Sequence, residues 1–262
     1  LPVYTGLVET ARTNNRLDNS VAAAYLATAS TLMQDTMLPA AEGFYREETE
    51  DLRRTHGQFA SPPWAIYGVL GIALDTTNNL GIAEGTIGEK QLAWLVAQLK
   101  AHPDQLVVVF SHHTSRSMTA GLPDPEEPGE KQYEGGVVVK TLTDHPNVIA
   151  WVNGHTHKNE MIPHTGPTPK QSFWEINTAS HVDFPQLARI IEVADNRDGT
   201  LSLFTPLIEA ASPATANPSD LSAKGLASLY RELAYNDIHR DDKLLGAEAD
   251  RNCELLLPHP LR

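Results

Sequence analysis

Residues 148–157 have the sequence VIAWVNGHTH, and this stretch decides the fold. Its continuous apolar run is typical of a strand buried on both faces of a parallel sheet. Two histidines separated by one residue follow directly. A second stretch, 106–113 (LVVVFSHH), is also a short apolar run that ends in histidines. Because ligands collect at the carboxyl ends of parallel strands, we expect both sets of imidazoles to meet in one crevice.

The segments around these two stretches alternate between strand and helix patterns. Residues 64–79 are β-rich, while 85–102 carry apolar side chains at helical spacing and stop before a proline. Residues 137–144 favour a further helix, and 188–206 are typical of a hairpin that turns at Asp198-Gly199. This order predicts an α/β fold in which a parallel-containing sheet has both faces covered.

The chain divides into three parts by composition. Residues 1–63 form a helical and loop segment, with a helix expected over 18–37. Residues 64–210 contain the α/β pattern. Residues 211–262 begin with a linker, continue in a helix near 220–235, and end in what we expect to be an irregular tail. Trp94, Trp151 and Trp174 are expected in the core.

Charge and composition exclude several classes of function. The 262 residues carry a formal net charge of −13, which argues against nucleic acid as a partner. No apolar run approaches the ~20 residues that a membrane-spanning helix needs. The single cysteine, Cys253, permits no intrachain disulfide and does not indicate the cellular compartment. The sequence does not indicate the oligomeric state either.

The histidines after the two strands are the candidate metal ligands. A His-x-His motif or a strand-end His pair alone is also compatible with a simple capping role, but the two together favour a metal site for Zn, Fe, Mn or Ni. Gly154 is expected to bend the backbone sharply and to leave room for an ion. Six other histidines are expected to be solvated surface residues: His56, His102, His145, His164, His239 and His259.

With these motifs the chain resembles the C-terminal half of the calcineurin-like metallophosphoesterases over residues 64–206. VVVFSHHT, VIAWVNGHTH and the helix-like GTIGEKQLAWLVAQL carry the resemblance. INTASHVDFPQLARIIEV resembles a segment of a bacterial, largely actinobacterial, branch. The resemblance implies a mixed β-sheet sandwich flanked by helices. It also implies hydrolysis of a small phosphate mono- or diester by a hydroxide that two divalent ions (Fe, Mn or Zn) activate. His112 and His155 would bind one metal and His157 the other.

The sequence lacks the motifs that are typical of the N-terminal half of this family. The chain has no Gly-Asp, Gly-Asn or Asn-His dipeptide, and its one Asp-x-His, Asp237-Ile-His239, lies near the end of an expected helix. We therefore expect a fragment that begins after those motifs, although a degenerate complete protein also fits. Three imidazoles without a carboxylate do not offset the repulsion between two cations. We thus expect at most one weakly held metal and poor hydrolysis by this chain alone.

Other residues near the expected crevice are candidates for substrate contact. His113 is assigned to substrate binding, with metal ligation as the open alternative. His181 and Asp183 are assigned to substrate binding or to orienting substrate or ligands, and no residue of the chain is assigned as a catalytic acid or base. A metallo-β-lactamase would need an Asp-His pair after His157, where Lys158-Asn159-Glu160 stand instead. An amidohydrolase barrel would need its His-x-His on the first strand. The alternative that stays open is a non-catalytic scaffold or binding module.

Overall fold

The structure is a computed structural model that describes residues 10, 22–32, 35–36, 68–125 and 127–262. The chain separates into two compact units, Leu1–Pro63 and Trp64–Arg262. In the first unit, helix α2 (Ala22–Leu32) confirms the helix expected within 18–37, whose ends fall outside the described residues, as does the loop expected over 41–63. None of the described helices is long and apolar enough to cross a bilayer.

A five-stranded mixed sheet forms the centre of the second unit. Its strands stand in the order β1 (Val69–Ala73), β3 (Leu106–Phe110), β5 (Val148–Asn153), β7 (Phe173–Asn177) and β6 (Glu160–His164). The first four are parallel and β6 runs antiparallel to β7. The expected strands at 106–110 and 148–153 are confirmed, and they are direct neighbours in the sheet.

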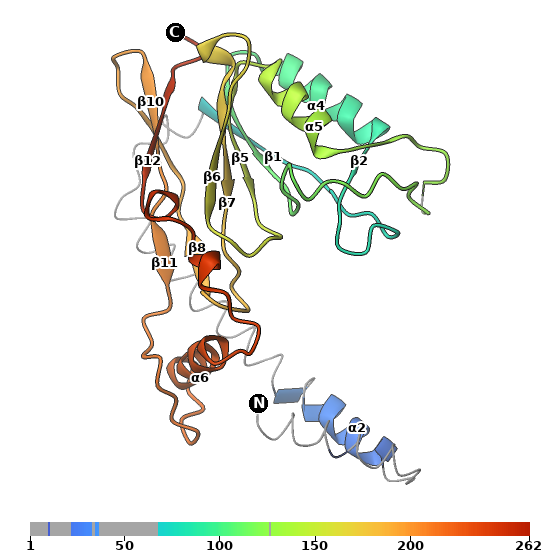
Figure 1. The fold of residues 1–262 in the computed structure, drawn as a ribbon, viewed down its shortest axis with the longest axis vertical. Coiled ribbons are helices and arrows are strands. Elements are labelled where there is room, and N and C mark those ends of the chain that lie inside the picture. The colour runs from blue at the N-terminus through green and yellow to red at the C-terminus, as the bar shows by residue number, and fades with distance from the viewer. Residues whose placement is uncertain (1–9, 11–21, 33–34, 37–67, 126) are drawn as a thin grey trace. The chain divides into compact units, whose positions relative to one another are not determined.

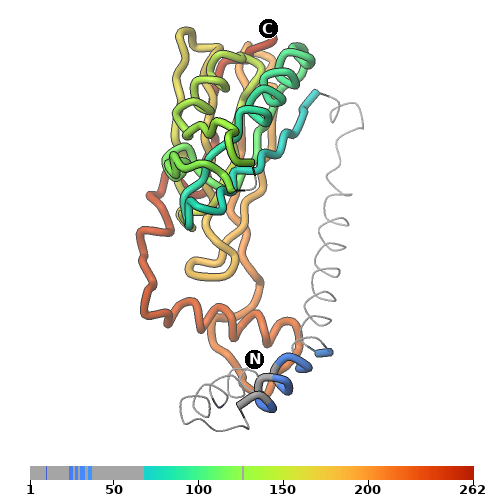
Figure 2. The backbone as a smooth tube through the Cα atoms, turned by 90° about the vertical axis from the view of Figure 1, so that its right-hand side faces the viewer, coloured from blue at the N-terminus to red at the C-terminus, as the bar shows by residue number. Residues whose placement is uncertain are grey.

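Helices cover one face of this sheet. Helices α4 (Glu89–Ala101) and α5 (Gly135–Thr143) lie side by side on it (Figures 1 and 2). Their buried side chains form one core cluster with the odd-numbered residues of β3 and with Trp151. Ile87, which the sequence pattern placed on the helix, belongs instead to strand β2 (Ile87–Gly88), paired with β4 (Gln132–Tyr133). Trp94 was expected in the core, but it is 46% exposed on α4.

A second sheet covers the opposite face, which completes the expected sandwich (Figure 1). This three-stranded sheet contains β9 (Glu192–Asp195), β10 (Thr200–Phe204) and β12 (Glu254–Pro258). The hairpin expected over 188–206 is therefore confirmed as β9 and β10. The tail was expected to be irregular, and this was wrong. Strand β12 pairs along the whole of β10, because Leu255 and Leu257 alternate into the core.

A local irregularity in the central sheet explains how β5 serves both cores. The pairing of β3 with β5 shifts between Val107 and Val108, so that Val107 faces Val148 while Val108 faces Ala150. Ile149 and Ala150 consequently both belong to the core beneath the second sheet. The remaining elements are helix α6 (Ala223–Tyr235), the two-stranded sheet of β8 (Leu187–Arg189) and β11 (Leu207–Glu209), and 3-10 turns at Pro169–Gln171, Asp242–Leu245 and Glu248–Asp250.

Candidate metal centre

Histidines from two neighbouring strand ends converge at the carboxyl edge of the central sheet. The ligand atoms of His112, His113 and His155 all lie within 4.8 Å of one another. The pair His155 Nδ1 and His112 Nε2 is 3.2 Å apart. Two nitrogens that ligate one tetrahedral ion at about 2.1 Å lie about 3.4 Å from each other, so this spacing fits a shared metal. The expected convergence of His112 with His155 is thus present in the structure.

The backbone between the two strand ends keeps these rings together. Ser111 N donates to the carbonyl of Val152 (3.0 Å), and Gly154 N donates to the carbonyl of His112 (3.1 Å). These bonds continue the pairing of β3 with β5 one step beyond the strands. Each histidine segment is therefore held by the other before any ion binds.

The sharp backbone bend occurs at the histidines and not at Gly154. His155 has φ +60° and His157 has φ +56°, whereas Gly154 is not among the residues of positive φ. A Cβ added at Gly154 would make only an ordinary van der Waals contact, 3.9 Å from the carbonyl oxygen of Thr178. The expectation that Gly154 supplies the bend was wrong. A left-handed backbone is uncommon and costly for residues other than glycine, so this loop is locally strained.

Burial favours the neutral, metal-competent form of two rings. Burial lowers the pKa of His113 below its ordinary value, and the neighbouring His155 and His112 lower it further. Burial likewise lowers the pKa of His155, with His112 acting in the same direction. Because a metal ligand must offer an unprotonated nitrogen, both shifts make the cluster compatible with a bound cation.

His113 is the most constrained ring of the cluster. Its Nδ1 lies 2.8 Å from the hydroxyl of Thr76, and the ring also interacts with the backbone of Ala83. Only 6% of His113 is exposed, whereas His112 is exposed and His155 half-buried. The sequence assigned His113 to substrate contact; the structure places it within the His cluster, and its role stays a prediction.

His157 lies outside that three-histidine group and contacts a carboxylate instead. Its Nδ1 lies 2.5 Å from Asp183 Oδ2, and the carboxylate accepts this hydrogen bond. A His that donates from Nδ1 to a carboxylate presents Nε2 with a free lone pair, which is the arrangement found behind many metal-bound histidines. Asp183 therefore lies where it orients His157. His181, its neighbour in the loop after β7, is exposed. The substrate roles of both stay predictions.

Two glycines that the sequence did not single out permit the histidine loop to pack. A Cβ on Gly85 would stand 2.5 Å from the ring of His113, and a Cβ on Gly135 would stand 2.0 Å from the carbonyl oxygen of Ser115. Only glycine allows such close approach. Their neighbours in sequence carry no sign of this role, because the contact depends on tertiary packing.

Buried oxygen atoms without a protein partner surround the ends of β5 and β7. Among the described residues these include Oδ1 of Asn153, Asn177 and Asp183. Buried polar atoms are normally bonded to protein, water or an ion. The edge of the sheet that holds the histidines is thus polar, and several of its buried oxygen atoms have no hydrogen-bond partner in the protein. This is expected of a site that accepts a hydrated ligand.

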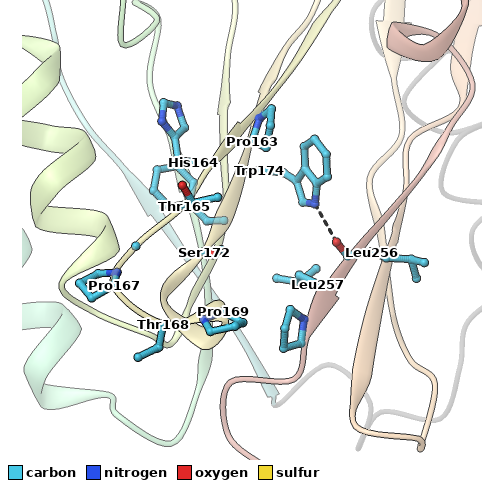
Figure 3. Close-up of a pocket in the computed structure, with 13 residues that line it drawn as sticks. Pro163, His164, Thr165, Pro167, Thr168, Pro169, Ser172, Trp174, Leu256 and Leu257 are labelled. Atoms are coloured by element: carbon cyan, nitrogen blue, oxygen red, sulfur yellow. Dashed lines mark hydrogen bonds between the residues drawn. The ribbon is translucent and has the colours of Figure 1, made fainter.

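A cavity of about 410 Å³ lies at the other end of β6 and β7 (Figure 3). It is bounded by the turn between these strands and by β12, where the indole of Trp174 donates to the carbonyl of Leu256 (3.0 Å). His164, expected on the surface, lines this cavity with a side chain only 15% exposed. His259 was also expected on the surface and is buried.

The comparisons with known proteins are limited to parts of the chain. Residues 1–57 match the family model described as an actinobacterial sensor domain. No curated protein matches the chain. Among solved structures, a dimetal phosphatase from Danio rerio is similar at 21% sequence identity and a TM-score of 0.32. The match covers 48% of this chain and 37% of the phosphatase, so the chain spans well under two thirds of that protein's length. The site described above rests on its own geometry.

Proposed function

We propose that Trp64–Arg262 carries part of a metal-dependent phosphoesterase centre, with His112 and His155 binding one divalent ion. The observation that supports this proposal most directly is the 3.2 Å separation of His155 Nδ1 and His112 Nε2 at two adjacent strand ends. The lowered pKa of His155 supports the proposal, since it keeps that ring neutral where a cation needs it. Zn, Fe and Mn all accept imidazole ligands.

A second ion would be held through His157. Its Nε2 is the free nitrogen once Nδ1 donates to Asp183. Two ions in one centre would polarise a phosphoryl group and activate a hydroxide for in-line attack. Such a pair needs anionic ligands between the metals, because imidazoles do not compensate their charge.

The cluster among the described residues offers imidazoles only. Glu84 interacts electrostatically with His113 and His155, and His113 acts on Asp75. Asp75 Oδ1 is engaged by the backbone and hydroxyl of Thr77, and Glu84 accepts from Thr119. We therefore propose that this chain by itself holds one ion and hydrolyses phosphoesters slowly.

The alternative is a binding module that keeps the histidine cluster without catalysis. The specific observation in its favour is the absence of a carboxylate from the described cluster. The two functions differ in hydrolysis and not in metal binding. A test must therefore measure both on the same sample.

The test is a Co²⁺ titration followed by the visible absorption of the bound ion, with hydrolysis of p-nitrophenyl phosphate and its bis ester measured in parallel. His112→Ala and His155→Ala should each abolish the absorption band of the wild type. His239→Ala is the matched control, because His239 is exposed in the loop after α6 and should leave the band unchanged.

The outcomes separate the candidates. Metal-dependent hydrolysis that both site variants lose supports the phosphoesterase. Metal binding with no hydrolysis of either ester by any loaded sample supports the binding module. A wild type that binds no Co²⁺, or that binds it equally well without His112 and His155, rejects the metal centre.

A further inference from the structure

A fully buried carboxylate lies beneath the histidine cluster. Glu175, in the middle of β7, has none of its surface exposed to solvent. Its register partner on β5 is Trp151, and two residues earlier on its own strand Phe173 belongs to the core. Alternation along β7 therefore places a charged residue where an apolar one is expected.

Four hydrogen bonds compensate this charge. Oε1 accepts from the backbone N–H of Ser115 (2.8 Å) and from Asn153 Nδ2 (2.8 Å). Oε2 accepts from the hydroxyl of Ser115 (2.7 Å) and lies 2.6 Å from His164 Nε2. Burial alone would raise the pKa of the Glu175 carboxyl, but the bonds from His164, Ser115 and Asn153 together lower it below the ordinary value.

The partners of Glu175 belong to both histidine segments. Ser115 comes two residues after His113, and Asn153 comes two residues before His155. One carboxylate on β7 therefore bonds the loop that follows β3 and the end of β5 at the same time. Glu175 itself is not a member of the His cluster.

Stability alone does not explain why a charged residue is buried at this position. Removing it from water costs several kcal/mol, and a well-packed apolar group at the same place is often as stable or more so. What a carboxylate offers is directed bonding to several donors at fixed geometry. The donors here come from the two segments whose separation sets the distance between His112 and His155.

We propose that Glu175 is the positioning residue of the metal centre: its buried carboxylate fixes the loop after β3 against the end of β5 and so sets the affinity for the ion. The proposal deepens the proposed function and rests on it for the metal readout only. Its second readout, the environment of the rings, applies to the protein without metal.

The first variant is Glu175→Asp, which keeps the charge but withdraws it by one methylene from all four donors. Without metal, the ring ¹⁵N resonances of His112 and His155 should both move, although neither ring is hydrogen-bonded to Glu175. Affinity for Co²⁺ should fall by about 10- to 100-fold, the usual effect of losing a residue that orients ligands. The Co²⁺ absorption band should also shift, because the ligand geometry changes.

The second variant, Glu175→Gln, keeps the length. Its amide oxygen can still accept from Ser115 N and Asn153, and its NH₂ can donate to the Ser115 hydroxyl and to a neutral His164. Ring resonances and Co²⁺ affinity should therefore return to within a few-fold of the wild type. If Glu175→Gln lost as much Co²⁺ affinity as Glu175→Asp, the proposal that the hydrogen-bond geometry of Glu175 positions the ligands would be overturned.

The control is Asn147→Ala. Asn147 is buried and donates to the carbonyls of Leu99 and His102 at the opposite end of β5, so its loss destabilises the sheet without touching the histidine segments. It should leave the ring resonances and the Co²⁺ affinity unchanged. An equal loss of affinity in this control would reduce Glu175 to a general stabiliser and overturn the proposal.

The two proposals fail in distinguishable ways. If Glu175→Asp leaves the ring resonances unmoved, the positioning role is overturned, whether or not the wild type binds metal. A wild type that binds no Co²⁺ rejects the metal centre, and the ring resonances still decide the role of Glu175. If Glu175→Asp does not fold, Ser115→Ala, which removes only the hydroxyl bond, must move the same resonances by a smaller amount.

Discussion

The left-handed backbone at His155 predicts that glycine at this position gives a more stable protein than alanine does. His155 has φ +60°, a conformation that costs an L-residue about 1–2 kcal/mol and costs glycine nothing. His155→Ala and His155→Gly both lose the ring, so the difference between them isolates the backbone. Neither variant should bind Co²⁺.

The magnitude follows from two opposing effects. Glycine relieves about 1–2 kcal/mol of strain in the folded state. It also gains backbone freedom in the unfolded state, which lowers folding stability by about 0.5–1 kcal/mol. With the middle of each range, His155→Gly is expected to be more stable than His155→Ala by about 0.75 kcal/mol.

Urea denaturation followed by far-UV circular dichroism, with a chelator present, measures this difference directly. Lys158 serves as the matched control, since it is three residues beyond His155 and is not among the residues of positive φ. There the order should reverse, with Lys158→Gly less stable than Lys158→Ala. An alanine at 155 that is as stable as glycine would show that the loop is not strained, and the reasoning would fail.

Further predictions address the packing beneath the site. Gly85→Ala should weaken Co²⁺ binding and destabilise the fold by about 1–3 kcal/mol, because the added Cβ would stand 2.5 Å from the ring of His113. The control Gly136→Ala, whose Cβ would have no neighbour within 4 Å, should have neither effect in urea melts and Co²⁺ titrations. The folded-state pKa of Glu175 lies below its ordinary value of 4.5, so the unfolded chain takes up the proton first. The stability advantage over Glu175→Gln, measured by urea melts across pH, should diminish as the pH falls below about 4.5; an advantage that grows below that pH would contradict the pKa direction. Leu95→Ala, fully buried beneath the sheet, should cost about 2–5 kcal/mol in a urea melt with no direct effect on the metal spectrum; a loss below 1 kcal/mol would contradict the assigned core.

The sequence predicted the parts of the site that depend on strand position. The apolar runs 106–110 and 148–153 are buried parallel strands, and parallel neighbours end at the same edge of a sheet. That geometry alone brings His112 close to His155. The mixed α/β fold with both faces of the sheet covered followed from the same alternation of elements.

Features that depend on tertiary contacts were not predictable from the sequence. Glu175 stands in a short strand whose pattern gives no reason to expect a buried charge, because its four donors come from three other segments. Strand β12 is short and follows a long irregular stretch, so only its pairing with β10 identifies it. Trp94 is exposed because its face of α4 points away from the sheet, which helical spacing alone did not reveal.

Zinc X-ray absorption spectroscopy on the wild-type chain tests the central claim most directly. We predict that the bound ion is surrounded by at least two imidazole nitrogens at about 2.0–2.1 Å, with the outer-shell scattering of histidine rings. In His112→Ala and His155→Ala this histidine scattering should be lost, because neither variant holds the ion at the site. An ion surrounded by oxygen atoms only, or a ring count unchanged in both variants, would contradict the account.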